Sequence, residues 1–508
     1  MMSYPFLPVL IPLIGGVLVL LVRQAGLNLQ RLLSFLLVLA LLAVSVELMH
    51  IASQGSPQVY ALGNWVAPYG IVLMLDQLSA LMILITAILA VGALWYAIST
   101  KMDEQGSHFH VLFQIQLFGL NGAFMTGDVF NLFVFFEVLL LASYGLMLHG
   151  GGRLRTKAGL QYVVINLIGS TLFLFAVGAL YGVLGTLNIA DMANKVAVLS
   201  TEDQGVVAAA GLLLLLVFGI KAAMFPLYLW LPQAYSNAAA PVAALFAIMT
   251  KVGLYAIIRV HGTVFGENAQ ELAFFYTPWL LGLGLITIVL AALGVMASRG
   301  LREQVAYLVL ASIATLLIGI GLNTPAALSA SLYYLIHSTL IAGGFFLLAD
   351  IIARGKGSLE DHFKPGPAVP QAILIGSTFI FAAIAMVGMP PLSGFFGKVL
   401  ILSAALNHDY IGWILTLVLV SSLIMIIAMA RSGSVLFYHI QPNTESTGEP
   451  LNKLAYLAVI LLFSTSVVLV VFAQPITSMT DTIAQQLFDS NHYIHSVLNT
   501  PAVGEVSP

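Results

Sequence analysis

Apolar residues fill long, nearly unbroken stretches of the chain, and short polar segments separate one stretch from the next. A helix needs about 20 apolar residues to cross the ~30 Å hydrocarbon core of a bilayer. Stretches of about that length lie at residues 5–22, 32–52, 73–98, 109–126, 129–148, 158–185, 206–230, 241–260, 276–297, 303–322, 328–352, 370–404, 411–438 and 452–474. The pattern therefore predicts an all-α polytopic membrane protein with about 14 transmembrane helices.

Prolines interrupt two apolar segments that each also contain a lysine. The segment Lys221–Pro232 contains Pro226, and the segment Gly388–Lys398 contains Pro390 and Pro391. Proline removes a backbone donor and clashes with the preceding turn, so both segments are expected to be discontinuous helices. The carbonyl groups freed at such breaks are tolerated at membrane depth only when they are buried in protein or line a wet cavity.

The two interrupted segments lie five predicted helices apart, and an odd offset places two copies in opposite membrane orientations. Discontinuous helices in corresponding positions of two halves are typical of transporters built from inverted repeats, with their site near the membrane midplane. The expected organisation is an N-terminal three-helix region at 1–108, a first inverted five-helix repeat at 109–262, a second at 274–438, and a last helix with a polar outer tail at 452–508.

Composition supports the membrane assignment. Of the 508 residues, 60% are hydrophobic and only 8% are charged, whereas a soluble domain carries about 25% charged residues. The absence of cysteine excludes disulfides, thiolate metal sites and thiol catalysis. No phosphate-binding GxxxxGK[ST] loop occurs, and the net charge of −3 gives no indication of nucleic-acid binding. Together with the interrupted helices, these observations predict a transporter without a cofactor, rather than an enzyme.

The distribution of basic residues between loops predicts the orientation of the chain. Apart from three lysines inside apolar runs, 13 Lys and Arg residues follow odd-numbered helices, whereas only Lys195 and Arg259 follow even-numbered ones. Basic loops stay in the cytoplasm, so both termini are expected outside it. The first segment reads as a retained helix, and the tail from Gln474 to Pro508 is expected at the outer surface.

Four charged residues lie inside apolar runs, where a charge is costly. A lysine at the bilayer centre costs about 2.5–3.5 kcal/mol on insertion scales, yet Lys221, Lys251 and Lys398 all occupy such positions. Glu137 lies nine residues after Asp128, or roughly 13 Å along a helix. We interpret Glu137 and Lys221 as charge partners on an ion or proton path. The alternatives are a structural acid and lysines that extend to the membrane surface.

The remaining polar candidates divide into one relay and several structural residues. His337 lies in the middle of an apolar helix, and an imidazole with an ordinary pKa near 6.5 is a suitable proton relay; a satisfied core histidine is the alternative. Asp76 and Asp350 lie nearer helix ends and are expected to be structural. Asp128 is expected to cap the N-terminus of the helix that carries Glu137.

Four segments together resemble a known family. They are GNWVAPYGIVLMLD at 63–76, LNGAFMTGDVFNLFVFFEVLLLASYGL at 120–146, KAAMFPLYLWLP at 221–232 and MPPLSGFFGK at 389–398. These segments resemble the proton-pumping antiporter-like subunits shared by respiratory complex I and the Mrp multisubunit Na⁺/H⁺ antiporters. The first two are most similar to those of the branch formed by the Mrp D subunits.

The resemblance implies that Glu137, Lys221, Lys251 and Lys398 form the buried charge chain of the family, with His337 as its relay histidine. Within that chain we expect Lys251 to be the central proton carrier and Lys398 to gate the far half. One position departs from the family pattern. Relatives in the complex I branch often place a lysine about a turn and a half after the histidine, where this chain has Ala342.

The resemblance also implies a function and partners. It implies a complex of several small membrane subunits in a bacterial inner membrane that expels Na⁺, or Li⁺ or K⁺, against proton entry; no metal-binding residue is assigned. A second hypothesis is a membrane-arm, proton-pumping subunit of a respiratory NADH–quinone or hydrogenase-type redox complex. A third is a scaffold without its own path. The nature of the subunits that co-purify distinguishes the first two hypotheses.

Overall fold

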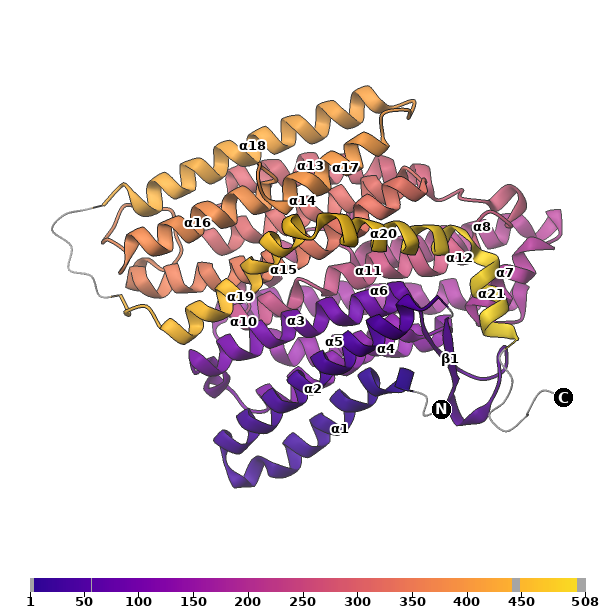
Figure 1. Cartoon of the computed structure of the whole chain (residues 1–508), viewed down its shortest axis with the longest axis horizontal. Helices are drawn as coiled ribbons and strands as arrows, with labels where there is room; N and C mark the ends of the chain where they lie inside the picture. Colours follow the sequence, from indigo (N-terminus) through magenta and orange to yellow (C-terminus); the bar gives the residue numbers. More distant parts are fainter. Residues whose placement is uncertain (1–3, 56, 441–447, 500–508) are drawn as a thin grey trace.

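The computed structural model describes residues 4–55, 57–440 and 448–499. Long helices run roughly side by side along the horizontal axis of Figure 1, and loops and short helices gather at the two ends of this bundle. Within the described residues, 12 helical segments are long and apolar enough to cross a membrane. The fold is therefore the predicted polytopic helical bundle.

The first part of the chain contains three long helices and a hairpin. Its elements are α1 (Leu7–Leu21), α2 (Leu27–Ser53), β1 (Gln58–Ala61), β2 (Val72–Leu75) and α3 (Gln77–Ser99). The two strands pair in antiparallel fashion, with Ala61 opposite Val72. Residues 73–75 of β2 were expected to be helical. Helix formation is delayed to residue 77 because the Asp76 carboxylate accepts from the Ser79 amide and the Ser79 hydroxyl accepts from the Asp76 amide, which is a capping box.

The next five helices precede the first break. They are α4 (Phe109–Met125), α5 (Val129–Met147), α6 (Arg153–Leu184), the short α7 (Ile189–Ala197) and α8 (Thr201–Lys221). Asp128 caps α5 as predicted, because its carboxylate accepts from the Asn131 amide at 2.8 Å. Burial raises the pKa of the Asp128 carboxyl.

The chain between α8 and residue 264 is more broken than expected. Residues 222–229 are not helical, and four short elements follow: α9 (Trp230–Asn237), α10 (Ala240–Phe246), α11 (Met249–Ala256) and α12 (Gly262–Val264). A π-helical stretch, η5 (Ile257–His261), connects α11 to α12. Pro241 lies in the first turn of α10, which begins at Ala240, as its fixed φ and missing N–H allow. The break between α10 and α11 was not predicted.

The second half repeats the alternation of long and broken helices. It contains α13 (Thr277–Ala297), α14 (Leu301–Gly321), α15 (Pro325–Lys356), α16 (Ala372–Val387), α17 (Ser393–Ala404) and α18 (Ile411–Phe437). The predicted break at the prolines lies between α16 and α17. The predicted boundaries of the two inverted repeats stay a prediction.

Burial separates a protein core from a lipid-facing shell. The most apolar 18-residue windows of Ala240–Val264 and Pro325–Leu359 are entirely buried, whereas those of α2 and α18 are only 28% buried. In Figure 1, α10, α11 and α15 lie in the middle of the bundle, and α1 and α18 lie at opposite edges. The predicted buried lysine Lys251 and the relay candidate His337 therefore both lie on core helices.

The C-terminal region differs from the simple polar tail that was expected. After α19 (Lys453–Val471), the chain forms α20 (Ala473–Phe488) and α21 (Ser490–Leu498). Helix α20 packs along α15, where Thr480 and Ser329 share a hydrogen bond of 2.9 Å. Residues 500–508 of the predicted tail lie outside the described residues. The 14 predicted spans correspond to the 12 long segments together with α4 and the pair α16 and α17, a correspondence that leaves their exact number a prediction.

Candidate functional site: charged and polar residues in the helical bundle

Lys221 is the last residue of α8, directly before the break at residues 222–229. Its side chain is buried, as predicted for an intramembrane lysine. The end of α8 leaves carbonyl groups without helical partners, and Trp230 donates from Nε1 to one of them, the Ile220 carbonyl, at 3.0 Å. The protein therefore satisfies part of the backbone that the break exposes, as membrane depth requires.

Glu137 and Lys221 are not in direct contact. The Ser170 hydroxyl donates to Oε1 of Glu137, and the Lys221 ammonium donates to Oδ1 of Asn166 at 3.0 Å. No nitrogen–oxygen distance of 4.0 Å or less joins Glu137 to Lys221, although the structure describes both residues. A direct pair at 4 Å would be worth about 4 kcal/mol at an effective dielectric constant of 20. The two predicted charge partners thus each contact a polar side chain of α6, and their pairing stays a prediction.

Lys251 has a different environment from Lys221. It lies in the first turn of α11, immediately after the unpredicted break, and is fully buried. Within the described residues its ammonium has no hydrogen-bond partner. The neighbouring Gly253 permits a close approach to α8, because a Cβ there would lie 2.6 Å from the Ala222 amide nitrogen. The helix that carries Lys251 therefore packs directly against the end of α8. The Lys251 ammonium itself has no hydrogen-bond partner among the described residues.

A small cavity lies beside Lys221 and is also lined by two residues of α11. Its volume is about 10 Å³, and its lining includes Lys221, Asn166, Tyr162, Met249 and Val252. Met249 and Val252 flank Lys251 in α11. A cavity needs about 10–15 Å³ of this measure to hold one water molecule. The cavity beside Lys221 is thus just large enough for one water molecule between Lys221 and α11.

His337 lies in the middle of α15 and is held by two bonds to other helices. Its Nε2 lies 3.0 Å from the Ala385 carbonyl, so this nitrogen carries a proton. Its Nδ1 lies 2.7 Å from the Ser393 hydroxyl, which lies 2.7 Å from the Ser466 hydroxyl. Two hydroxyl groups in series can reverse their donor directions together. The imidazole therefore has a route by which a second proton can be accommodated.

Lys398 lies in α17, after the second break, whereas Lys221 lies before the first one. Its ammonium donates to the Val387 carbonyl at 2.7 Å and to the Ser422 hydroxyl at 3.1 Å. Val387 is the last residue of α16, so Lys398 satisfies one of the free carbonyl groups at that helix end. A cation is favourable there because it also complements the helix dipole.

The structure gathers the predicted residues into two groups. Glu137, Lys221 and the surroundings of Lys251 meet where α5, α6, α8 and α11 pack together. His337 and Lys398 meet at the end of α16, whose Ala385 and Val387 carbonyl groups they contact. Across the residues that the structure describes, no hydrogen bond or ion pair joins Lys251 to His337.

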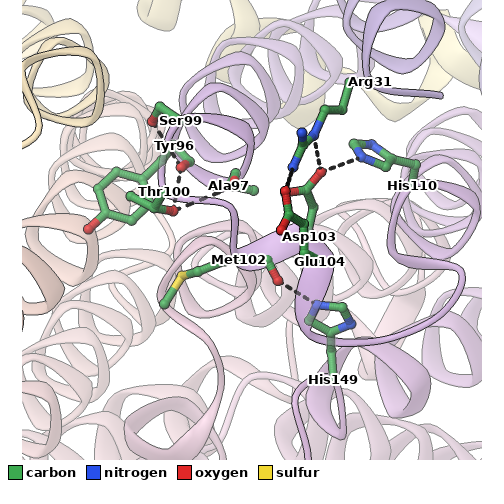
Figure 2. A network of polar contacts seen from close by, with 10 residues as sticks. All are labelled: Arg31, Tyr96, Ala97, Ser99, Thr100, Met102, Asp103, Glu104, His110 and His149. Atoms are coloured by element: carbon green, nitrogen blue, oxygen red, sulfur yellow. Dashed lines mark hydrogen bonds and ion pairs between the residues drawn. The ribbon is translucent and has the colours of Figure 1, made fainter. Parts of the chain in front are cut away.

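A further ionic network lies outside these two groups, at the end of the bundle where α3 ends and α4 begins. Figure 2 shows Arg31 donating to Asp103 at 2.6 and 2.7 Å, with His110 at 3.0 Å from the same carboxylate. Burial alone would raise the pKa of the Asp103 carboxyl, but the bonds from Arg31 and His110 outweigh it and lower that pKa. The network joins α2, the turn η4 (Met102–Gln105) and α4.

Asp76 and Asp350 are each paired with arginine, which is consistent with the structural role predicted for them. Asp350 contacts Arg302 and Arg354 at 2.8 Å. Asp76 contacts Arg259 at 2.5 Å. Arg259 was expected in a loop, but the structure buries it in η5, inside the membrane-length segment that begins at residue 240. Arg259 therefore no longer counts as a loop residue, and Lys195 remains as the basic loop residue after an even-numbered helix.

Sequence reasoning missed the uncharged polar residues of the site, which are Asn166, Ser170, Ser393, Ser422 and Ser466. Serine and asparagine are ordinary interface residues of membrane helices, so their presence in an apolar run carries little signal. A weak signal existed for two of them: Asn166 and Ser170 are four residues apart, and therefore on one face of a helix.

Comparison with known proteins places this arrangement in a family. The family model described as "NADH:quinone oxidoreductase/Mrp antiporter, TM" matches residues 126–425, which contain all five predicted site residues. A probable K⁺/H⁺ antiporter D subunit of Rhizobium meliloti (strain 1021) is 38% identical over 98% of both chains. A Na⁺/H⁺ antiporter D subunit of Alkalihalophilus pseudofirmus is 36% identical over 97% of this chain and 98% of its own.

A solved structure agrees with these relatives. A chain of the structure described as "Structure of Mrp complex from Dietzia sp. DQ12-45-1b" superimposes with a TM-score of 0.85 at 26% identity. The match covers 98% of this chain and 100% of that one. The chain therefore belongs to the transmembrane family shared by NADH:quinone oxidoreductases and Mrp antiporters, and within it to the antiporter D subunits.

Proposed function

We propose that this chain is a subunit of a bacterial plasma-membrane complex that exchanges a monovalent cation, Na⁺, for protons and is driven by the proton gradient. The names of the two relatives support cation/proton exchange, with K⁺ named in one and Na⁺ in the other. Membership of a multisubunit Mrp complex in the solved structure supports further membrane subunits as partners. The length and apolar composition of 12 helical segments among the described residues support a position in a lipid bilayer.

Protons pass, in this proposal, along Glu137, Lys221, Lys251, His337 and Lys398. The observation that carries the proposal is the buried ammonium of Lys251, which has no partner among the described residues. A fixed charge without a partner is expensive in a membrane interior, so the position suits a group that is charged only transiently. Lys221 and Lys398, by contrast, are each held by an oxygen acceptor.

Each end of this path has a role that follows from its contacts. In the first group, the charge states of Glu137 and Lys221 are linked through Ser170 and Asn166 of α6. In the second group, His337 passes a proton between its imidazole ring and the hydroxyl groups of two serines. Lys398 gates the far half, because its ammonium must leave the Val387 carbonyl before it can move. The two discontinuous helices that carry Lys221 and Lys398 belong to the two proposed inverted repeats.

The test uses inverted membrane vesicles that contain the whole complex, and it follows the pH change on addition of Na⁺, K⁺ or Li⁺. Glu137→Ala and Lys221→Ala should each abolish exchange, because the first leaves the buried Lys221 and the second the half-buried Glu137 without its proposed counter-charge. Equal amounts of complex in the membrane are required for the comparison. Near-normal exchange in either variant would contradict the proposed path. Co-purification of a flavin or Fe–S protein would instead support the redox-complex alternative.

A further inference from the structure

Helix α6 contacts both charged residues of the first group with one face. The Ser170 hydroxyl donates to the Glu137 carboxylate, and Oδ1 of Asn166 accepts from the Lys221 ammonium at 3.0 Å. Asn166 and Ser170 are both buried and lie four residues apart. Residues with that spacing are neighbours on the surface of a helix. Two charges from different helices therefore share a single polar strip of α6.

The orientation of the Asn166 amide is determined by its other contact. Its Nδ2 donates to the Tyr162 carbonyl at 2.8 Å. The NH₂ group is thus directed along α6, and the oxygen faces Lys221, which has only donors to offer. A reversed amide would lose both bonds. Asn166 is consequently a fixed acceptor for the ammonium, in contrast to a mobile water.

The Ser170 hydroxyl has one proton and two acceptors within reach. One acceptor is Oε1 of Glu137, and the other is the main-chain carbonyl oxygen of Asn166 at 3.0 Å. When Glu137 is a carboxylate, the hydroxyl must donate to it, because a carboxylate can only accept. When Glu137 is protonated, the acid proton can be donated to Ser170, and the serine proton then turns to the Asn166 carbonyl. Each state satisfies every donor.

We propose that Asn166 and Ser170 are positioning residues of the cation/proton exchange, which keep Glu137 and Lys221 at separate places and link their charge states through α6. The inference rests on the proposed function. A direct ion pair would have to be broken in each cycle, whereas neutral acceptors and donors can be exchanged with a smaller change in energy. The small cavity that Asn166 lines also borders Lys221 and α11, so a proton released by Lys221 can leave in the direction of α11.

The other titratable groups around this strip belong to three helices. Tyr144 of α5 and Tyr162 of α6 stack edge to face, with ring centroids 5.5 Å apart. The Tyr162 hydroxyl is already paired with Ser143 at 2.9 Å. Glu137 and Lys221 are the charged groups, from α5 and α8, that α6 contacts here. Ser170 contacts the Glu137 carboxylate, so a change of the pH profile in Ser170→Ala that Ser170→Thr reverses is assigned to Glu137 and not to Lys251 or His337.

The test compares Ser170→Ala with Ser170→Thr in vesicles that contain the whole complex. Ser170→Ala removes the hydroxyl that donates to the Glu137 carboxylate and leaves that oxygen without this partner. We expect exchange at neutral pH to fall at least tenfold and its pH profile to change. Ser170→Thr keeps the hydroxyl and should restore most of both properties.

Asn166→Asp tests the separation of the charges directly. It places a carboxylate against Lys221, and we expect a loss of exchange greater than tenfold while the complex still assembles. Thr171→Ala is the matched control, because Thr171 is also in α6 and bonds back to the Leu167 carbonyl at 3.0 Å, but it is exposed. That variant should exchange cations as the unmodified chain does.

Two results would overturn the inference. One is a Ser170→Ala variant whose exchange rate per complex and pH profile match those of Thr171→Ala. The other is a lower amount of complex with an unchanged rate and profile, which would make Ser170 merely structural. In either case, inactive Glu137→Ala and Lys221→Ala variants would leave the proposed function standing. Active Glu137→Ala and Lys221→Ala variants would remove both.

Discussion

The contacts of His337 depend on the absence of a side chain at Gly394. A Cβ on Gly394 would lie 2.2 Å from the Ala385 carbonyl oxygen and 2.6 Å from Nε2 of His337. Both atoms belong to the bond that orients the imidazole. Only glycine allows α17 to approach α15 and α16 this closely, so this position couples the packing of a helix to the geometry of the relay.

Gly394→Ala should therefore destabilise the protein and disturb the relay. Overpacking of this kind costs about 1–3 kcal/mol, and we expect a lower melting temperature of the purified complex together with reduced exchange. Gly412→Ala is the control, because nothing lies within 4 Å of a Cβ at that position in α18. Equal melting temperatures for the two variants would show that α17 can move away at little cost.

Charged site residues could be found from the sequence, and their partners could not. Lys221, Lys251 and Lys398 stand out because a charge in an apolar run is costly wherever the helix lies. The partners of these charges depend on which helices pack together, and helix periodicity carries no information on that point. Glu137 and Lys221 were both identified, and their role as charge partners stays a prediction, but the side chains of α6 that contact them were not identified.

At the scale of elements, the turn η4 is held by groups that respond to acid. His149 donates from Nε2 to the Met102 carbonyl at 2.8 Å, as Figure 2 shows. Burial lowers the pKa of the His149 imidazole, and the neighbouring Arg155 adds to this effect, against the raising influence of the Met102 bond. The His149 imidazole therefore has a lower pKa in the folded protein than in the unfolded chain.

Acidification should consequently weaken this end of the bundle. With a folded pKa below the unfolded value near 6.5, the unfolded chain binds more protons as the pH falls through 6.5, so stability present above that pH is lost below it. The loss is at most about 1.4 kcal/mol per pH unit for one group. His149→Gln keeps a donor without the titration, and should reduce the fall in melting temperature between pH 7.5 and 5.5.

The exposed His439 supplies the control for this measurement. His439→Gln should leave the acid-induced fall in melting temperature unchanged. An identical fall in His149→Gln and in the unmodified chain would show that His149 does not contribute. Asp103 acts in the same direction but only at lower pH, because its depressed pKa makes its contribution disappear below about pH 4.

Proline breaks were predictable, whereas the other irregular elements were not. The break after Lys221 and the break between α16 and α17 both follow from prolines in apolar runs. The break between α10 and α11, and the π-helical stretch η5, have no proline inside them. They depend on tertiary packing, including the close approach of α8 at Gly253 and the pairing of Arg259 with Asp76. A π-helical stretch beside a candidate site fits their frequent occurrence at functional sites.

At the scale of the whole molecule, the two ends of the described chain lie at the same end of the bundle. The turn at residues 4–6 contacts β1, and α21 also contacts β1, as the right side of Figure 1 shows. A common side for both termini agrees with an even number of membrane crossings. Which side of the membrane this is follows from the loop charges and stays a prediction.

Reporter fusions test that orientation. A C-terminal alkaline phosphatase should be active and a C-terminal green fluorescent protein should be dark, because the predicted position is outside the cytoplasm. Fusions in the loop between α13 and α14, near the basic Arg299 and Arg302, should give the opposite pair of results. Fluorescence from the C-terminal fusion with inactive phosphatase would contradict the predicted orientation.

The central claim is that protons pass through the chain by way of a buried lysine that must lose its proton. Lys251→Arg tests it, because arginine stays charged at any working pH and no hydrogen bond of Lys251 to a described residue is lost. Lys251→Met removes the charge with a side chain of similar length. Lys453→Arg, at an exposed position in α19, is the matched control.

The measurement is the Na⁺-induced pH change in inverted vesicles with equal amounts of assembled complex, from pH 7 to 9. We predict that Lys251→Arg and Lys251→Met both assemble and exchange at least tenfold more slowly than Lys453→Arg across this range. Full exchange by Lys251→Arg would contradict the central claim, because a permanently charged side chain cannot carry the proton. The carrier role would then have to move elsewhere, with His337 as the first candidate.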